Sequence, residues 1–290
     1  MPELPEVETI RKGIIQKLKG KKIANIDIRV PKLFIGPEGA PVGGNPKVII
    51  GAKITDAHRV AKILEIVLDN GYSILIHLKL TGQLVYVAKG ENKIGVGIHF
   101  QKAYGQPLPH AHTHIIYTFS DGSHLYFNDL MKFGWHRVIK SSDVDKIIGP
   151  DKFGPEPGSK DFTEKYLKNI FSKSGKPIKL VLMDQQKIAG LGNIYANDGL
   201  YWAGILPTRP AKSLRGGEIS KLKEAIEKVI DLGLKYGGSS ENTYVNIEGK
   251  KGHYMEHAAV YQKTRDPKGH LIKKIQLGGR GTFFCSKCQF

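Results

Sequence analysis

Cysteine is scarce in this chain of 290 residues, which holds only Cys285 and Cys288, in one CxxC pair near the C-terminal end. A framework of several disulfides is therefore excluded. Long apolar runs are also missing, because no stretch approaches the roughly 20 apolar residues that a membrane-spanning helix needs. Acidic residues stand among the first eight positions, where a secretory signal would be basic and then apolar. These absences favour an intracellular protein that does not enter a membrane.

Acidic residues are few relative to basic ones: 27 Asp and Glu face 44 Lys and Arg, a formal net charge of +17. Such a charge favours a polyanionic partner, nucleic acid first, and makes the binding depend on salt. The alternative is a basic protein whose charge serves only solubility. With 40% hydrophobic residues, the chain can bury the core of one large domain or two ordinary ones.

The first 140 residues are typical of a sheet-rich domain. Runs of β-branched and aromatic residues end at turns such as 69–71 and 121–122. Apolar residues at helical spacing predict a helix over 5–19, whose buried face would hold the N-terminus against the sheet. Strands are expected at 23–30, 53–60, 62–68, 73–78, 114–119 and 124–127.

Helix breakers at 154–158 indicate a linker over 141–160 and a helical second domain over 161–250. Its helices are expected at 162–171, 177–184, 194–202 and 218–235. An arm over 251–290 follows. Strands at 258–265 and 270–277 flank the turn Asp266-Pro267-Lys268-Gly269, which predicts a β-hairpin.

The first residues, Met1-Pro2-Glu3-Leu4-Pro5-Glu6, carry a distinctive chemistry. Removal of Met1 would give Pro2 a free secondary amine, which can attack a sugar C1′ and form an iminium ion. Glu3 beside it could move protons at the sugar oxygen. The alternative is an ordinary helix start, with Pro early and acidic residues near the positive end of the helix dipole.

With this start, the chain resembles the formamidopyrimidine-DNA glycosylase family, which shares its fold with endonuclease VIII. Further matching runs follow in order along the whole chain, at 61–62, 77–82, 128–134, 182–185, 190–196 and 203–207. The resemblance implies an α+β multidomain fold: an N-terminal β-sandwich with flanking helices, then a helix-two-turn-helix domain and a zinc-finger-like β-hairpin arm. It also implies base excision repair by a monomer that binds double-stranded DNA with oxidised bases or abasic sites.

The resemblance also assigns residue roles. Pro2 and Glu3 would be catalytic, and Lys62 and Arg280 would assist at the elimination and phosphate-contact steps. Gly190 and Gly192 leave room for a phosphate, to which Asn193 and helix amides can donate. The remaining expected DNA contacts are Glu6, which positions the flipped nucleotide, and His77, His112 and Lys179.

Leu80, Met131 and Phe133 match the positions whose side chains fill the stack when a base is extruded. Here the chain departs from the family, which usually has Met, Arg and Phe, with the Arg reading the orphaned base. Met131 cannot donate a hydrogen bond. The prediction is weakened discrimination of the opposite base. Phe133 as a plain core aromatic is the alternative.

The segment Ser239-Ser240-Glu241-Asn242-Thr243-Tyr244 resembles the loop that closes over an everted oxidised purine. Backbone amides from Glu241 to Tyr244 could hold the O6 of 8-oxoguanine. We therefore expect a bifunctional glycosylase and lyase that excises oxidised purines through a Pro2 Schiff base with β,δ-elimination. The alternatives are a preference for oxidised pyrimidines, as in endonuclease VIII, and a catalytically weak protein that binds damaged DNA.

No cofactor is needed for this chemistry, and the metal set at the arm is incomplete. The family's finger has two CxxC pairs, whereas only Cys285 and Cys288 remain, and structural zinc takes four protein ligands. His253, His257 or His270 could contribute, but the spacing favours a hairpin without metal that presents Arg280.

A second histidine group, His110, His112 and His114, alternates along the chain and would share one face of a strand. Such a face could bind a metal. The family resemblance instead favours His112 near DNA.

Overall fold

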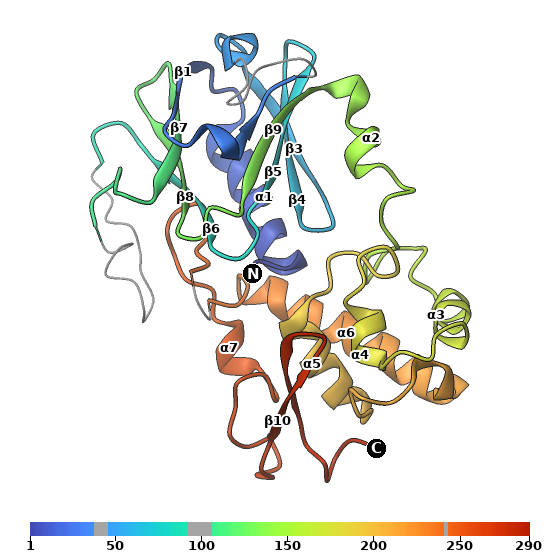
Figure 1. Ribbon diagram of the computed structural model, residues 1–290. Helices are drawn as coiled ribbons and strands as arrows, with labels where there is room; N and C mark the ends of the chain where they lie inside the picture. The colour runs from blue at the N-terminus through green and yellow to red at the C-terminus, as the bar shows by residue number, and fades with distance from the viewer. Residues whose placement is uncertain (38–45, 92–105, 241–242) are drawn as a thin grey trace. The chain divides into compact units, whose positions relative to one another are not determined.

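The computed structural model describes residues 1–37, 46–91, 106–240 and 243–290 (Figure 1). They form two compact units, one of Met1–Gly149 with Tyr236–His253 and the other of Pro150–Lys235 with Tyr254–Phe290. Residues 236–250, which the sequence placed in the helical domain, and residues 251–253, which it placed in the arm, thus group with the first unit. The expected linker 141–160 is divided between the two.

Two sheets build the first unit, as the expected β-sandwich requires. One has the order β1-β7-β8-β6 and is antiparallel; the other has the order β2-β9-β5-β4-β3, with only β2 and β9 parallel. The six expected strands are confirmed, and three more join them. The bounds are β1 Ile23–Ile28, β2 Phe34–Ile35, β3 Ile54–Val60, β4 Ile63–Leu68, β5 Tyr72–His77, β6 Gly82–Val87, β7 Thr113–Phe119, β8 His124–Asp129 and β9 Trp135–Lys140.

Helix α1 (Leu4–Leu18) confirms the expected N-terminal helix (Figure 1). Its buried side chains, Val7, Ile10, Ile14 and Leu18, belong to one hydrophobic core with residues of both sheets. The apolar spacing of the sequence thus fixes the start of the chain against the sheets. Short elements complete this unit: η1 Pro31–Leu33, η2 Pro46–Ile49, η3 Ser141–Asp143 and α2 Asp145–Ile148.

The second unit is mainly helical, and the four expected helices are confirmed. Gly204, with φ +74°, ends α5 in the left-handed conformation that glycine adopts without strain. The long α6 buries one face, including Leu222, Ile226 and Val229. The bounds are α3 Glu164–Ser172, α4 Ile178–Leu182, α5 Asn193–Ala203, η4 Ala211–Ser213, α6 Gly216–Lys235 and α7 Tyr254–His257.

The C-terminal hairpin exists, but its position differs from the expectation. It pairs β10 (Lys273–Leu277) with β11 (Arg280–Phe284). The turn at Asp266 forms, with the Gly269 amide donating to the Asp266 carbonyl (2.9 Å), yet only a single bridge flanks it. The expected strand 258–265 is wrong, because the buried Asp198 carboxylate accepts the backbone amides of residues 259, 260 and 261. Amides held by a side chain cannot join a strand ladder.

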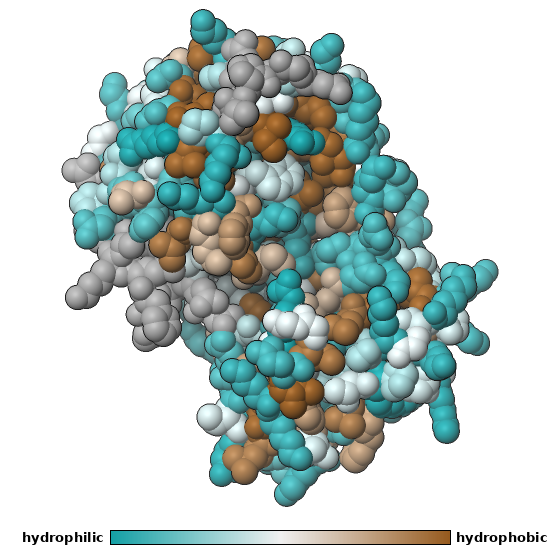
Figure 2. Space-filling view, viewed as in Figure 1, coloured by the Kyte–Doolittle hydropathy of each residue, from teal (hydrophilic) through white to brown (hydrophobic). Residues whose placement is uncertain are grey.

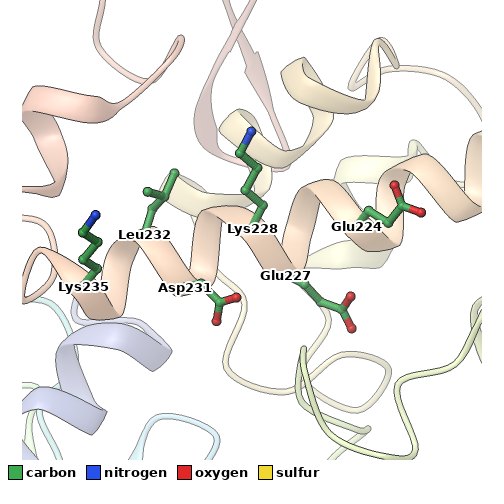
Figure 3. A pocket seen from close by; sticks show the side chains of 6 residues that line it. All are labelled: Glu224, Glu227, Lys228, Asp231, Leu232 and Lys235. Atoms are coloured by element: carbon green, nitrogen blue, oxygen red, sulfur yellow. The ribbon is translucent and has the colours of Figure 1, made fainter.

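The visible surface is mainly hydrophilic, with smaller apolar patches (Figure 2). A shallow hollow lies along α6, where Lys228 points away from Glu227 and Asp231 (Figure 3). Since these side chains do not converge, the hollow is a solvated helix face. Within the described ranges, no helix has the length and apolar character needed to cross a membrane.

Candidate active site

Pro2 and Glu3 are buried at the start of α1. The Glu3 amide donates to Oε2 of Glu6 (2.7 Å), and Oε1 of Glu6 accepts the amide of Ser239 (2.7 Å). Glu6 is itself 1% exposed, so both of its oxygens are used inside the protein. This carboxylate therefore fixes the turn that carries Pro2 to the segment around Ser239.

Gly238 allows that connection. Its φ is +88°, and a Cβ here would lie 2.8 Å from Cγ and 2.9 Å from Oε1 of Glu6. Any larger residue would be strained and would displace the carboxylate. The sequence gives no sign of this constraint, because Glu6, 232 residues earlier in the chain, comes close to Gly238 only in the folded protein.

The loop after Ser239 is held by side chains as well. Ser240 Oγ donates to the Tyr244 carbonyl (2.8 Å) and accepts the Gly252 amide (2.8 Å), while Gln83 donates to the carbonyl of Thr243. Burial and the nearby Glu6 charge raise the pKa of Tyr244, whose side chain belongs to the core. Only the backbone of Tyr244, and not its side chain, is therefore available to contact a base. Glu241 and Asn242 lie outside the described residues.

Lys62 and His77 come together at one end of β4 and β5. Lys62 is 5% exposed and follows Ala61, which has a φ of +53°. Burial, with the charges of Lys79 and Lys62, lowers the pKa of His77 to about 3. His77 is therefore neutral at pH 7, and its Nδ1 accepts the Lys79 amide (2.9 Å).

Leu80, Met131 and Phe133 are exposed apolar side chains on two neighbouring loops. Their exposed fractions are 37%, 43% and 54%. The loops touch, since the Met131 amide donates to Oγ1 of Thr81 (3.0 Å). The alternative that Phe133 is a core aromatic is wrong. Large apolar side chains gathered on a surface in this way are typical of a binding site.

The three alternating histidines do not share a strand face. β7 begins at Thr113, so only His114 lies in it, and its Nε2 contacts the Asp129 carbonyl (2.7 Å). His110 and His112 lie in the preceding turn with ring centroids 6.0 Å apart. The expectation that the three histidines share one face of a strand is wrong, because the residues directly before Thr113 form a turn. In the part of the chain that the structure describes, none of the three joins a metal-ligand group. His112 is half-buried.

In the second unit, two of the residues expected to contact phosphate, Lys179 and Asn193, bind the backbone of the C-terminal hairpin. Lys179 is fully buried, and its Nζ donates to Oγ1 of Thr282 (2.6 Å) and to the Gly281 carbonyl (3.2 Å). Asn193, the first residue of α5 after the N-cap Gly192, donates to the same carbonyl (3.2 Å). Lys179 is thus no solvated surface charge. Arg280, next in the chain to Gly281, is exposed.

Four side chains near the hairpin can hold a metal ion: Asp266, His270, Cys285 and Cys288, whose ligand atoms all lie within 4.8 Å of one another. His270 Nδ1 is 3.3 Å from Cys288 Sγ, which lies 3.2 Å from Oδ2 of Asp266. Burial and Asp266 raise the pKa of Cys288 to about 11. The two cysteines alone are too few to hold structural zinc, and Asp266 and His270 bring the group of possible ligands to four. Asp266 was missed because it was interpreted as a turn residue.

A sheet-rich unit that fixes an N-terminal Pro-Glu turn, and a helical unit with a basic hairpin, define a class of DNA glycosylases with a helix-two-turn-helix domain. Residues 1–136 match the family model described as formamidopyrimidine-DNA glycosylase N-terminal domain. Residues 153–245 match the formamidopyrimidine-DNA glycosylase H2TH domain. The chain belongs to the formamidopyrimidine-DNA glycosylase family.

Similar proteins match over their full length. The formamidopyrimidine-DNA glycosylases of Pelotomaculum thermopropionicum and Bacillus subtilis are 36% and 34% identical, over 100% of this chain and 99% of theirs. The Lactococcus lactis protein in complex with abasic-site DNA has a TM-score of 0.85 at 30% identity, over 99% of both chains. A complex of the wild-type lactococcal protein with DNA containing an oxidised pyrimidine gives 0.84 at 30%, with the same coverage.

Proposed function

We propose that this protein is a bifunctional DNA glycosylase and abasic-site lyase that removes oxidised purines, 8-oxoguanine and formamidopyrimidines, from duplex DNA. The observation that carries the proposal is the buried Pro2-Glu3 turn, held through both oxygens of Glu6. A nucleophile held in one geometry needs little further ordering when it meets the sugar. The full-length similarity to formamidopyrimidine-DNA glycosylases supports the substrate class.

The reaction begins when Pro2, freed by removal of Met1, attacks C1′ of the everted nucleotide. The C1′–N bond breaks, and the base leaves with a proton. The nitrogen electron pair of Pro2 then expels the ring oxygen O4′, which takes a proton from Glu3, and the opened sugar is held at C1′ as an iminium ion. That cation takes up the electron pair of the C2′–H bond, and the 3′ phosphate leaves in β-elimination. Loss of the 5′ phosphate follows in δ-elimination. Glu3 moves the protons at the sugar oxygen.

Positive charges and backbone amides hold the DNA. Lys62 assists at the elimination step, and the exposed Arg280 contacts a phosphate near the lesion. Lys179 and Asn193 support that contact, because they hold the backbone carbonyl of Gly281, directly after Arg280. The amides that open α5 add the positive end of a helix dipole. The loop amides after Ser239 receive the flipped base.

Zinc fits the four-residue group of the arm. Tetrahedral zinc, with bonds of about 2.0–2.3 Å, separates its ligand atoms by roughly 3.3–3.8 Å. The contacts of Cys288 with His270 and Asp266, 3.3 and 3.2 Å, are close to this spacing. We propose that Asp266, His270, Cys285 and Cys288 hold one Zn²⁺, which would stabilise the arm and take no part in the reaction.

Metal analysis of the purified protein tests the zinc site. We expect one zinc per chain, lost in Cys285→Ser and retained in His253→Ala, whose histidine lies outside the group. Full-length folded protein that contains no zinc, and takes up none when zinc is added, would contradict the proposal. Cobalt substitution gives a second readout, since thiolate ligation of tetrahedral Co²⁺ produces intense visible absorption.

Oxidised pyrimidines are the second candidate substrates, favoured by the lactococcal complex with such DNA. Paired duplexes that contain either 8-oxoguanine or thymine glycol separate the two preferences. A protein that only binds damage is less well supported, because the Pro2-Glu3 turn is intact.

Borohydride trapping on duplex DNA with 8-oxoguanine tests the main proposal. Mass spectrometry first establishes that Met1 has been removed. We expect a covalent adduct with the wild type and a lost or sharply reduced adduct with Pro2→Gly, whose amine is primary. The adduct should be retained in Pro5→Ala, which changes a proline in the first turn of α1 but keeps the secondary amine of Pro2. Tight binding without an adduct would leave the damage-binding alternative.

A further inference from the structure

Asp129 is a fully buried carboxylate at the end of β8, directly before the loop that carries Met131 and Phe133. Its Oδ2 accepts the Gly134 amide (2.7 Å), and its Oδ1 accepts the Met131 amide (3.2 Å). Burial of a carboxylate is costly unless hydrogen bonds replace water. Here the donors come from both ends of one exposed loop, so the carboxylate fixes the shape of that loop.

Thr81 joins this loop to the neighbouring one. Its hydroxyl donates to Oδ1 of Asp129 and accepts the Met131 amide (3.0 Å). Thr81 directly follows Leu80, which is exposed like Met131 and Phe133. The two loops are therefore connected through one buried hydroxyl and one buried carboxylate.

Both loops contain residues in a costly conformation. Lys79 and Lys132 have φ values of +52° and +56°, in the left-handed region that is unfavourable for residues other than glycine. The space is also tight, since a Cβ on Gly134 would lie 2.6 Å from the Phe127 ring and 3.1 Å from Oδ2 of Asp129. Such backbone persists only where surrounding contacts determine it.

We infer that Asp129 and Thr81 are positioning residues that hold Leu80, Met131 and Phe133 as a preformed apolar wedge. The inference rests on the proposed function, because the wedge enters the stack left by an everted base. A wedge that is ordered before binding loses little conformational freedom when it enters the stack. Asp129 and Thr81 therefore act on eversion of the base and not on the chemistry of Pro2.

Thr81→Val tests this, with Thr81→Ser as the matched control. Valine keeps the shape and loses both hydrogen bonds, whereas serine keeps the hydroxyl. We expect Thr81→Val to excise 8-oxoguanine from duplex DNA about tenfold more slowly, the effect of one or two lost hydrogen bonds. Borohydride trapping on a single-stranded abasic oligonucleotide, which needs no eversion, should stay within twofold of the wild type. Thr81→Ser should behave as the wild type in both.

Hydrogen exchange at the Met131 and Gly134 amides gives a readout that does not depend on activity. We expect faster exchange of these two amides in Thr81→Val, while amides of the sheets away from the two loops exchange as in the wild type. Equal exchange with excision at the wild-type rate would overturn the inference, and so would an equal loss in the duplex and single-stranded assays. If the wild type traps no abasic DNA at all, the proposed function fails, and the exchange measurement still decides whether Thr81 holds the loop.

Discussion

Met131 stands where the family resemblance leads us to expect an arginine that reads the orphaned base. Its side chain is 43% exposed on the wedge loop, and a thioether accepts only weakly and donates nothing. We expect little preference for cytosine over adenine opposite the lesion. Met131→Arg should raise the ratio of the two excision rates about tenfold, the effect of a new hydrogen bond of about 1.4 kcal/mol. Single-turnover rates on matched duplexes measure this ratio. A strong cytosine preference in the wild type would refute the expectation.

Among single residues, the sequence allowed prediction of those candidate-site residues that stand in short contiguous runs. Pro2, Glu3 and Glu6 stand together, so a catalytic role could be predicted for this run from the order of its residues together with the family resemblance. Asp129, Thr81 and Gln83 were missed because their importance depends on partners up to 160 residues away. Asp266 is a similar case, since only the fold brings it to Cys288.

Asn197 couples two elements of the second unit, helix α5 and the hairpin. Its Oδ1 accepts the Phe283 amide (2.9 Å), and its Nδ2 donates to the Asn193 carbonyl (2.5 Å). Asn197→Ala leaves a buried amide without its acceptor, which costs about 1–3 kcal/mol. We expect weaker binding of abasic DNA in titrations, because the strand that carries Arg280 loses a fixed partner. Equal affinities for Asn197→Ala and the wild type would contradict this coupling.

Most elements could be predicted from local composition and spacing. The helix over 5–19 shows the apolar spacing of a helix buried on one face. The six strands of the first unit are runs of β-branched and aromatic residues between turns, and several of them are buried on both faces. The strand expected at 258–265 was wrong although its composition suits a strand, because Asp198 takes its amides. β11 was not expected, since Arg280-Gly281 has little strand propensity and only pairing with β10 makes it a strand.

On the scale of the whole molecule, buried histidines make stability depend on pH. Burial lowers the pKa of His136 to about 3, and its Nδ1 is 2.7 Å from the hydroxyl of Tyr117. Below its ordinary pKa of 6.5, this histidine takes up a proton in the unfolded chain but not in the folded one. Acid therefore favours unfolding from about pH 6.5 down to about 3, and each pH unit costs about 1.4 kcal/mol. His77 acts in the same direction.

Urea unfolding at pH 7, 6 and 5 measures this loss. His136→Asn, which keeps an acceptor for Tyr117, should be less stable at pH 7 because it leaves a cavity, but its stability should fall less between pH 7 and 5. The exposed His58 of β3 provides the control, since His58→Gln should keep the wild-type slope. If His136→Asn loses as much stability as the wild type over this range, the acid sensitivity comes from other groups. A shallower slope would show that the Tyr117–His136 pair, buried between the sheets, is maintained only while that imidazole is neutral.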